Sequence, residues 1–383
     1  MWRNSVAVLD VRSAEVAVFV GERGVNNTFV FRASKTESYD GYEDGAFYNV
    51  EGLAESVQRA VAAVEQICGE RIHDLYIGVP GEFLYVTPKA QDIGFPKQRK
   101  IGSKDLENLA EGGKDEYEGY TCIRSSNVFY TTADNRRVAE PEGISSTGLS
   151  GVFSYFYCSN YFIDVMNGIF TDMKINLHFL PTQLAMANYL IPSETRDDYA
   201  IFLDVGFLSS TISVSLGNGI LLQNTYWAGK AHIAFILMQK FGLPYDASVA
   251  LLGRANLYSK NSEGIAEFVY KNVTYEIPIS TFLEAVKEGL DQLCEKVSAF
   301  LEECSSKELE YKPIYISGEG LSSIRGALEH ISKRLSRTCE KLAPDLPYYN
   351  KTSMSSRIAL MDMASEDHRK SKLMYRLINI IGG

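Results

Sequence analysis

Two aspartates that each end an apolar strand pattern are the residues best placed to do chemistry in this chain. Asp10 ends "SVAVLD" and Asp204 ends "AIFLD", and a tight turn into a second strand follows each of them. Aspartate at such a place often only shapes the turn, but it can also orient Mg²⁺ or its water shell beside a phosphate group. The small and hydroxyl residues of the two turns are Ser13, Gly206, Ser209 and Ser210. Since backbone N–H groups and hydroxyls bind phosphate in such turns, the two turns could form a phosphate site, and a plain structural turn is the alternative.

A third turn is rich in glycine and follows an apolar strand. The segment "IYISGEGLSSIRG", Ile314–Gly326, passes from an apolar strand through Gly318 and Gly320 into a helix start. Glycine lacks a Cβ atom, so the backbone at these positions can approach a flat ligand closely. An ordinary turn has the same residue types, and the segment alone leaves both interpretations open.

Bulky residues stand where a phosphate-binding turn needs small ones. Phe207 and Leu208 follow Gly206, and side chains of that size would exclude a triphosphate or force the loop to retreat. Arg12 in the first turn allows two outcomes. Its guanidinium could donate hydrogen bonds to a bound anion, or it could fill the phosphate site by pairing with Asp10 or Asp204.

Composition limits the class of protein. The chain has 383 residues, 45% of them apolar and 22% charged, with a net charge of −10. Its length predicts more than one domain, and its acidity argues against a nucleic-acid partner. The six cysteines form no C-x-x-C pair, which disfavours a zinc or redox motif. A strand pattern begins almost at the first residue, and no run of eighteen apolar residues occurs, so we expect a cytoplasmic protein.

The order of elements predicts an α/β fold with an internal duplication. A β-hairpin with a central aspartate opens each half, at Asp10 and at Asp204. The segment from 81 to 164 differs from both halves, with short strands, one helix at Lys104–Glu111 and many tyrosines. Further helices are expected at Val50–Gly69, Ile233–Tyr258 and Thr281–Cys304, the last with a capping box between Thr281 and Glu284.

We therefore divide the chain into two lobes, an insertion and a tail. The predicted ranges are 1–80 with 165–197 for the first lobe, 81–164 for an inserted α+β subdomain, 198–232 with 310–365 for the core of the second lobe, 233–309 for its helical and strand subdomain, and 366–383 for an amphipathic tail.

Four segments in this order resemble the actin-like ATPase superfamily, and within it the FtsA family of bacterial cell-division proteins most closely. They are "VLDVRSAEVAVFVGE", "FLPTQLAMANYL", "LDVGFLSSTISV" and the glycine turn at Ile314–Gly326. The resemblance implies a two-lobed, ribonuclease H-like fold with an FtsA-type insertion, two phosphate hairpins, a connecting helix and an adenosine turn. It implies ATP and Mg²⁺ as cofactors, with Mg²⁺ at Asp10 and Asp204. The residues implied for nucleotide binding are Asp10, Arg12, Ser13, Asp204, Gly206, Ser209, Ser210, Gly318 and Gly320.

This chain departs from the superfamily pattern where ATP chemistry is done. Phe207 and Leu208 replace two glycines, and Thr211 replaces a trailing aspartate. Leu180 stands in place of the glutamate before Pro181, and leucine can neither orient water nor accept its proton. Loss of such a group costs about two to four orders of magnitude in rate. The departures favour a division or cytoskeletal scaffold, or a membrane-tethering adaptor, with weak or lost ATP binding and hydrolysis.

Other members of the superfamily supply the alternatives. They are an active ATPase, a small-molecule kinase and a PilM-like pilus assembly adaptor. The scaffold interpretation implies protein partners, such as division filament proteins or further copies of this chain in a polymer.

The C-terminal segment "RKSKLMYRLINIIGG" has the pattern of an amphipathic helix. Its apolar residues Leu373, Met374, Leu377, Ile378, Ile380 and Ile381 fall along one stripe. Arg369, Lys370, Lys372 and Arg376 lie mainly off that stripe. Residues 369–381 could bind an anionic membrane from the cytoplasmic side, or the helix could dock on the body of the protein.

Overall fold

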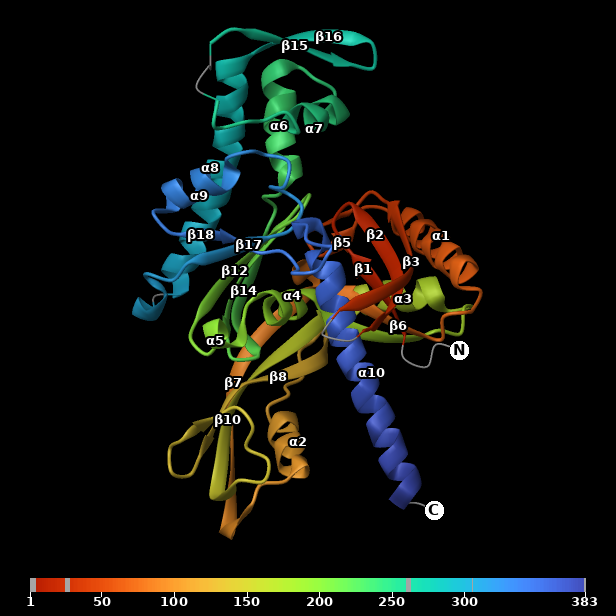
Figure 1. Cartoon of the computed structure of the whole chain (residues 1–383), viewed down its shortest axis with the longest axis vertical. Helices are drawn as coiled ribbons and strands as arrows, with labels where there is room; N and C mark the ends of the chain where they lie inside the picture. Colours follow the sequence, from red (N-terminus) through yellow and green to blue (C-terminus); the bar gives the residue numbers. More distant parts are fainter. Residues whose placement is uncertain (1–4, 25–27, 260–262, 305, 382–383) are drawn as a thin grey trace.

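A computed structural model shows two α/β lobes, a subdomain that extends from them, and a long C-terminal helix (Figure 1). The structure describes residues 5–24, 28–259, 263–304 and 306–381, with side chains described as far as Lys372. Each lobe is built on a five-stranded sheet, and a third sheet lies in the subdomain. The predicted α/β class with two lobes is confirmed. Where each unit begins and ends along the chain stays a prediction.

The first lobe contains the sheet β11-β6-β1-β2-β3. Its strands are β1 (Val6–Val11), β2 (Glu15–Arg23), β3 (Phe29–Ser38), β6 (Asp74–Val79) and β11 (Asn176–Pro181). A small hairpin, β4 (Tyr42–Glu43) and β5 (Ala46–Phe47), follows β3. β1 pairs antiparallel with β2 and parallel with β6, so Asp10 lies at the end of a central strand, opposite Ala17 and Gly78.

Both faces of this sheet are covered because its strands are apolar on both sides. Helices α1 (Val50–Cys68) and α3 (Asn160–Phe170) pack on one face. Helices α4 (Thr182–Leu190) and α10 (Ser355–Ile381) pack on the other. Side chains alternate along a strand, so Val8 and Asp10 face α4 and α10 while Leu9 faces α1 and α3.

The first long helix shows how local sequence sets these boundaries. Asn49 caps the start of α1, where its side chain accepts a hydrogen bond from the Gly52 N–H. Gly69 ends the helix in a left-handed conformation at φ 69°, which glycine adopts without steric cost. Its buried residues, Leu53, Val57, Ala60, Val61 and Val64, recur at helical spacing. The predicted helix is confirmed within one residue.

The second lobe repeats the topology of the first. Its sheet has the order β14-β13-β12-β17-β18. The strands are β12 (Ala200–Val205), β13 (Ser210–Leu216), β14 (Gly219–Tyr226), β17 (Ile314–Ser317) and β18 (Cys339–Lys341). β12 again pairs antiparallel with its hairpin partner and parallel with the next strand, so Asp204 lies opposite Thr211 and Ser317. The predicted duplication is therefore present in the fold.

The helices of the second lobe surround this sheet and carry a distal hairpin. They are α5 (Ser193–Arg196), α6 (Lys230–Phe241), α7 (Tyr245–Leu252), α8 (Ile279–Cys304) and α9 (Ala327–Leu335), and the hairpin is β15 (Ile265–Tyr270) with β16 (Val273–Pro278). Two expectations were wrong here. Gly242 takes φ 62° and Pro244 follows, so the helix expected over 233–258 divides into α6 and α7. Helix α8 begins at Ile279, so Thr281 lies inside it and cannot be its N-cap.

The inserted subdomain is a long antiparallel sheet with one helix. The sheet order is β7-β10-β8-β9, with strands β7 (Leu84–Lys100), β8 (Tyr120–Thr132), β9 (Arg137–Val138) and β10 (Ser145–Ser159). Helix α2 (Ser103–Glu111) packs on it, close to the predicted range. The expectation of short strands was wrong. The strands continue through polar stretches because half of their side chains face solvent, as the alternating burial of β7 shows.

Helix α10 joins the core to the C-terminal end without interruption. Its first half is buried through Ile358, Leu360, Met361 and Ala364. It then continues past the first lobe, on the same side as the inserted subdomain (Figure 1). The tail predicted from residue 366 is thus the continuation of a core helix. The predicted apolar stripe from Leu373 onward lies outside the described side chains. Among the described helices, none has the length and apolar content needed to cross a bilayer.

Candidate functional site

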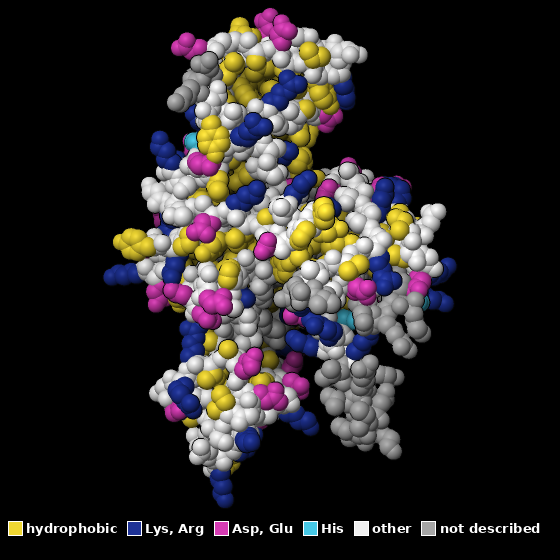
Figure 2. Space-filling view, viewed as in Figure 1, with side chains coloured by type: hydrophobic (Ala, Val, Ile, Leu, Met, Phe, Trp, Pro, Cys, Tyr) yellow, Lys and Arg dark blue, Asp and Glu magenta, His cyan; other side chains and the backbone are white. Residues whose placement is uncertain are grey.

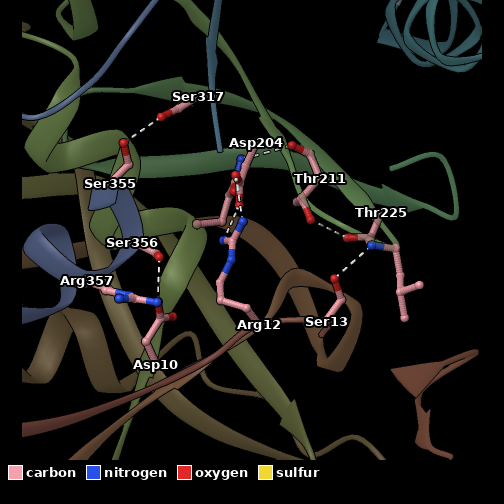
Figure 3. A network of polar contacts seen from close by, with 12 residues as sticks. Asp10, Arg12, Ser13, Asp204, Thr211, Thr225, Ser317, Ser355, Ser356 and Arg357 are labelled. Carbon is pink, nitrogen blue, oxygen red and sulfur yellow. Dashed lines mark hydrogen bonds and ion pairs between the residues drawn. The ribbon is translucent and has the colours of Figure 1, made fainter. Parts of the chain in front are cut away.

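The two predicted phosphate turns face each other across the interface between the lobes. Arg12, in the turn between β1 and β2, reaches Asp204 at the end of β12 (Figure 3). Its Nη1 donates to Oδ2 at 2.7 Å and its Nη2 donates to Oδ1 at 3.3 Å. The two side chains are only 14% and 10% exposed. Of the two alternatives, the structure shows Arg12 paired with Asp204.

This ion pair is strongly shielded from solvent. Burial by itself lowers the pKa of the Arg12 guanidinium, but the adjacent Asp204 carboxylate outweighs that effect and raises the pKa well above its ordinary value. Arg12 therefore remains charged. A bidentate guanidinium–carboxylate pair also fixes the relative orientation of its two partners. The pair thus holds the first turn of one lobe against the central strand of the other.

The hydroxyl and backbone groups of the turns bond to each other. Ser13 Oγ accepts a hydrogen bond from the Leu208 N–H at 3.0 Å, so the two hairpins are in direct contact. The Gly206 N–H donates to the Ser209 carbonyl at 2.9 Å. Ser210 Oγ donates to the Ala228 carbonyl at 2.8 Å, inside the second lobe. These groups were predicted to bind phosphate, but each already has a hydrogen-bond partner within the protein.

Asp10 lies next to a different element, the start of α10. Its carboxylate is fully buried and accepts a hydrogen bond from Ser356 Oγ at 2.6 Å (Figure 3). Arg357 Nε lies 4.0 Å away, and Nη2 of the same guanidinium donates to Glu15. Burial raises the pKa of Asp10, and the charges of Arg12 and Arg357 and the Ser356 hydrogen bond oppose this rise.

The start of α10 also contacts the second lobe. Ser317 at the end of β17 and Ser355 share a hydrogen bond of 2.7 Å between their hydroxyls. One helix start therefore bonds to a central strand of each lobe, through Ser355 on one side and Ser356 on the other. Sequence reasoning missed both serines, since they lie far from the aspartate turns along the chain and carry no motif.

The glycines of the third turn pack tightly against the second hairpin. Gly318 has φ +91°, and a Cβ atom there would lie 2.2 Å from the Val205 carbonyl oxygen and 2.4 Å from Asp204 Oδ1. A Cβ atom on Gly320 would lie 2.4 Å from the Gly206 carbonyl oxygen. The glycines are thus needed for contact within the protein. Between them, burial raises the pKa of Glu319, and the charge of Arg12 opposes the rise.

Two cavities remain near these turns, and they differ in size. The space between Arg12, Asp204, Gly206 and Thr211 is only about 20 Å³, close to the volume that holds a single water molecule. A second cavity of about 320 Å³ lies beside the turn between β17 and α9, lined by Tyr258, Gly318, Gly326, Lys341 and Thr352 among others. Typical small-molecule sites measure about 300–1,000 Å³, so only the second could hold a compact organic ligand in this conformation.

The start of α4 faces the small cavity with a residue that was not predicted. Gln183 is buried and donates to Ser213 Oγ at 2.9 Å and to the Thr211 carbonyl at 3.4 Å. These bonds link α4 to β13 of the other lobe. Leu180, at the position of the superfamily glutamate, is buried among apolar side chains next to α4 and α10. Its surroundings are those of a core residue.

Comparison with known sequences relates part of this chain to a cell-division protein. FtsA of Pseudomonas aeruginosa is 25% identical over 145 residues, which are 38% of this chain and 34% of that protein. FtsA of Streptococcus pneumoniae is 28% identical over 104 residues, or 27% and 22% of the two chains. The matches thus span about a third or less of the relatives' own length. No family model matches the chain.

Comparison with solved structures gives the fold over nearly the whole chain. A chain of the PilM–PilN type IV pilus biogenesis complex superposes with a TM-score of 0.63 at 12% identity, covering 94% of this chain and 98% of that one. MreB5 of Spiroplasma citri bound to AMPPNP gives 0.57 at 8% identity, covering 99% of both. The chain therefore has an actin-like fold, as predicted. Its sequence similarity is to FtsA, as predicted.

An actin-like chain raises the question whether its turns fit ATP and Mg²⁺. Solved structures of this fold include MreB5 bound to AMPPNP. Here Arg12 is paired with the Asp204 carboxylate, and the Leu208 N–H donates a hydrogen bond to Ser13. The cavity that remains between the turns is about 20 Å³. Among the residues with described side chains, no group of three or more His, Cys, Asp or Glu is arranged to hold a metal ion. In this conformation the phosphate turns do not fit a triphosphate with its metal.

Proposed function

We propose that this chain is an FtsA-like scaffold or membrane-tethering adaptor of the actin superfamily that works without ATP turnover. The observation that carries the proposal is the buried ion pair between Arg12 and Asp204, which fills the space between the phosphate turns. A side chain of the protein thereby supplies the positive charge that holds the lobes together. Closure of the lobes then needs no ligand. Thermal unfolding with and without Mg·ATP tests the proposal, and we expect no change in melting temperature.

Further contacts support a permanently closed arrangement. The Leu208–Ser13 bond, the Gln183–Ser213 bond and the Ser317–Ser355 bond each link segments that lie far apart in the sequence. The inserted subdomain adds another, since Ser126 Oγ donates to the Asn218 carbonyl at 2.6 Å. An assembly protein benefits from such rigidity because partners meet a preorganised surface.

One observation favours the alternative of weak nucleotide binding. The cavity of about 320 Å³ beside Gly318 and Gly326 is large enough for a compact ring system. An ATPase or small-molecule kinase would also need the phosphate turns to open, and Leu180 offers no group that positions water or accepts a proton. We therefore propose a scaffold function in preference to a catalytic one. A PilM-like adaptor remains the alternative within the non-catalytic class.

The partners proposed are proteins and a membrane. Division filament proteins and further copies of this chain are the protein candidates, in keeping with the similarity to FtsA. We place the protein in the cytoplasm, at the inner face of the membrane. The membrane contact would be made by residues 369–381, which continue α10 beyond the body of the first lobe (Figure 1).

Removing the end of α10 tests the membrane contact. A chain that ends at Asp367 loses Arg369, Lys370, Lys372 and Arg376 together with the apolar stripe predicted from the sequence. Each basic residue near an anionic bilayer contributes about 1 kcal/mol, so we expect binding to anionic vesicles to fall by at least about a hundredfold. Co-sedimentation with vesicles of anionic and of neutral lipid measures this. Equal pelleting of the two chains would reject the anchor.

A further inference from the structure

Where α10 leaves the body of the protein, its acidic and basic residues have different surroundings. Its acidic residues are paired with the body of the protein. Asp367 accepts from Arg124 of β8, at 2.7 Å between Oδ2 and Nη1 and 3.2 Å between Oδ1 and Nη2. Asp362 and Glu366 lie 3.1 Å and 3.7 Å from Arg23 Nη1 of β2. The basic residues that follow, Arg369 and Lys370, are exposed, and Lys372 is half-buried.

The first lobe contributes more positive charge beside this turn. A cavity of about 570 Å³ lies between α10 and the starts of β1 and β6, lined by His368 of α10 and by Glu70, Arg71, His73 and Asp74 among others. Arg71 and His73 are exposed. In the space-filling view, Lys or Arg side chains and a histidine gather where α10 leaves the lobe (Figure 2). We call Arg71, His73, Arg369, Lys370 and Lys372 the basic collar.

The carboxylates beside the collar compensate only part of its charge. Asp74 already accepts from His178 Nε2 at 3.1 Å and from Asn176 at 3.2 Å. Glu70 is the other carboxylate of the cavity. His368 Nε2 is buried and has no hydrogen-bond partner among the described residues. The collar thus places four permanent cations beside two carboxylates, in a chain whose net charge is −10.

We propose that the basic collar binds the phosphate groups of anionic lipids, so that the first lobe itself rests on the membrane beside the end of α10. This inference rests on the membrane contact proposed above and adds Arg71, which lies far from the C-terminal segment in sequence. Helix α10 contains neither glycine nor proline from Ser355 to Ile381, and its first half is buried in the core. A contact at both the lobe and the helix end would therefore fix the orientation of the whole molecule on the bilayer.

The test compares the full-length chain with two single variants on vesicles that contain phosphatidylglycerol. Arg71→Gln removes one collar charge, and Lys296→Gln removes one charge from the exposed surface of α8 as the matched control. At about 1 kcal/mol per basic residue near the surface, Arg71→Gln should weaken binding about fivefold and Lys296→Gln should leave it nearly unchanged. The difference should shrink at high salt, because screening weakens exposed electrostatic contacts.

The outcomes separate this inference from the proposed function. If the full-length chain binds and the two variants bind equally well, the collar is overturned while the helix anchor stands. If the full-length chain does not bind anionic vesicles at all, both the anchor and the collar are rejected. Circular dichroism of each variant verifies that the fold is retained.

Discussion

Replacing Arg12 with alanine is expected to lower the free energy of unfolding by about 3–5 kcal/mol. Removing one partner of a buried ion pair leaves the other charge without compensation, which is costly in a site shielded from water. Asp204 is 10% exposed and would be left in that state. The same substitution removes the ion pair that joins the two phosphate turns. Chemical denaturation of Arg12→Ala, monitored by circular dichroism, measures the effect.

Two controls identify the source of this loss. In Arg12→Ala/Asp204→Ala, the second substitution removes the stranded carboxylate, so the combined cost should be well below the sum of the single ones. Arg136→Ala breaks the exposed pair with Asp134, whose side chains are 64% and 57% exposed, and should cost less than about 1 kcal/mol. An Arg12→Ala variant no less stable than Arg136→Ala would contradict the assigned role.

Gly318→Ala is expected to destabilise the chain by about 2–6 kcal/mol. Its φ of +91° strains any residue with a Cβ atom, at about 1–3 kcal/mol. The new methyl group would also lie 2.2 Å from the Val205 carbonyl oxygen and 2.4 Å from Asp204 Oδ1, and relieving such overlap costs about 1–3 kcal/mol more. Asp204 would have to move away from Arg12. Denaturant unfolding of the variant measures the loss.

A second glycine separates the two contributions. Gly143 has φ +81°, and a Cβ atom there would meet nothing within 4 Å. Gly143→Ala therefore carries the backbone strain without the steric overlap. We expect Gly318→Ala to be clearly less stable than Gly143→Ala. Equal stability would mean that the third turn is not held tightly against Asp204.

The sequence pattern predicted the strands and helices of the molecule better than the contacts between them. Alternating apolar runs that end at Asp10 and Asp204 located the central strand of each lobe, because strand periodicity is a local property. Phe207 and Leu208 were expected to exclude a triphosphate, but neither lines the space that remains between the turns, where Arg12 and Asp204 lie. The prediction of one helix over 233–258 was wrong because Gly242 ends one helix and Pro244 precedes the next.

Long-range contacts could not be predicted in this way. Arg12 had two possible carboxylate partners, and only the three-dimensional arrangement shows it bonded to Asp204. Ser356 meets Asp10 across 346 positions of the chain, and nothing in the local sequence around either residue indicates the other. Gln183 likewise looks like an ordinary residue in the first turn of a helix. Its bond to Ser213 depends on how the two lobes close.

Thermal unfolding with millimolar Mg·ATP tests most directly whether this actin-like chain stays closed without a nucleotide. A ligand present at one hundred times its dissociation constant stabilises the folded state by about 2.7 kcal/mol. With Arg12 and Asp204 bonded in the place of the phosphates, we expect the same melting temperature with and without Mg·ATP, and no release of phosphate. A clear rise in melting temperature accompanied by phosphate release would contradict it.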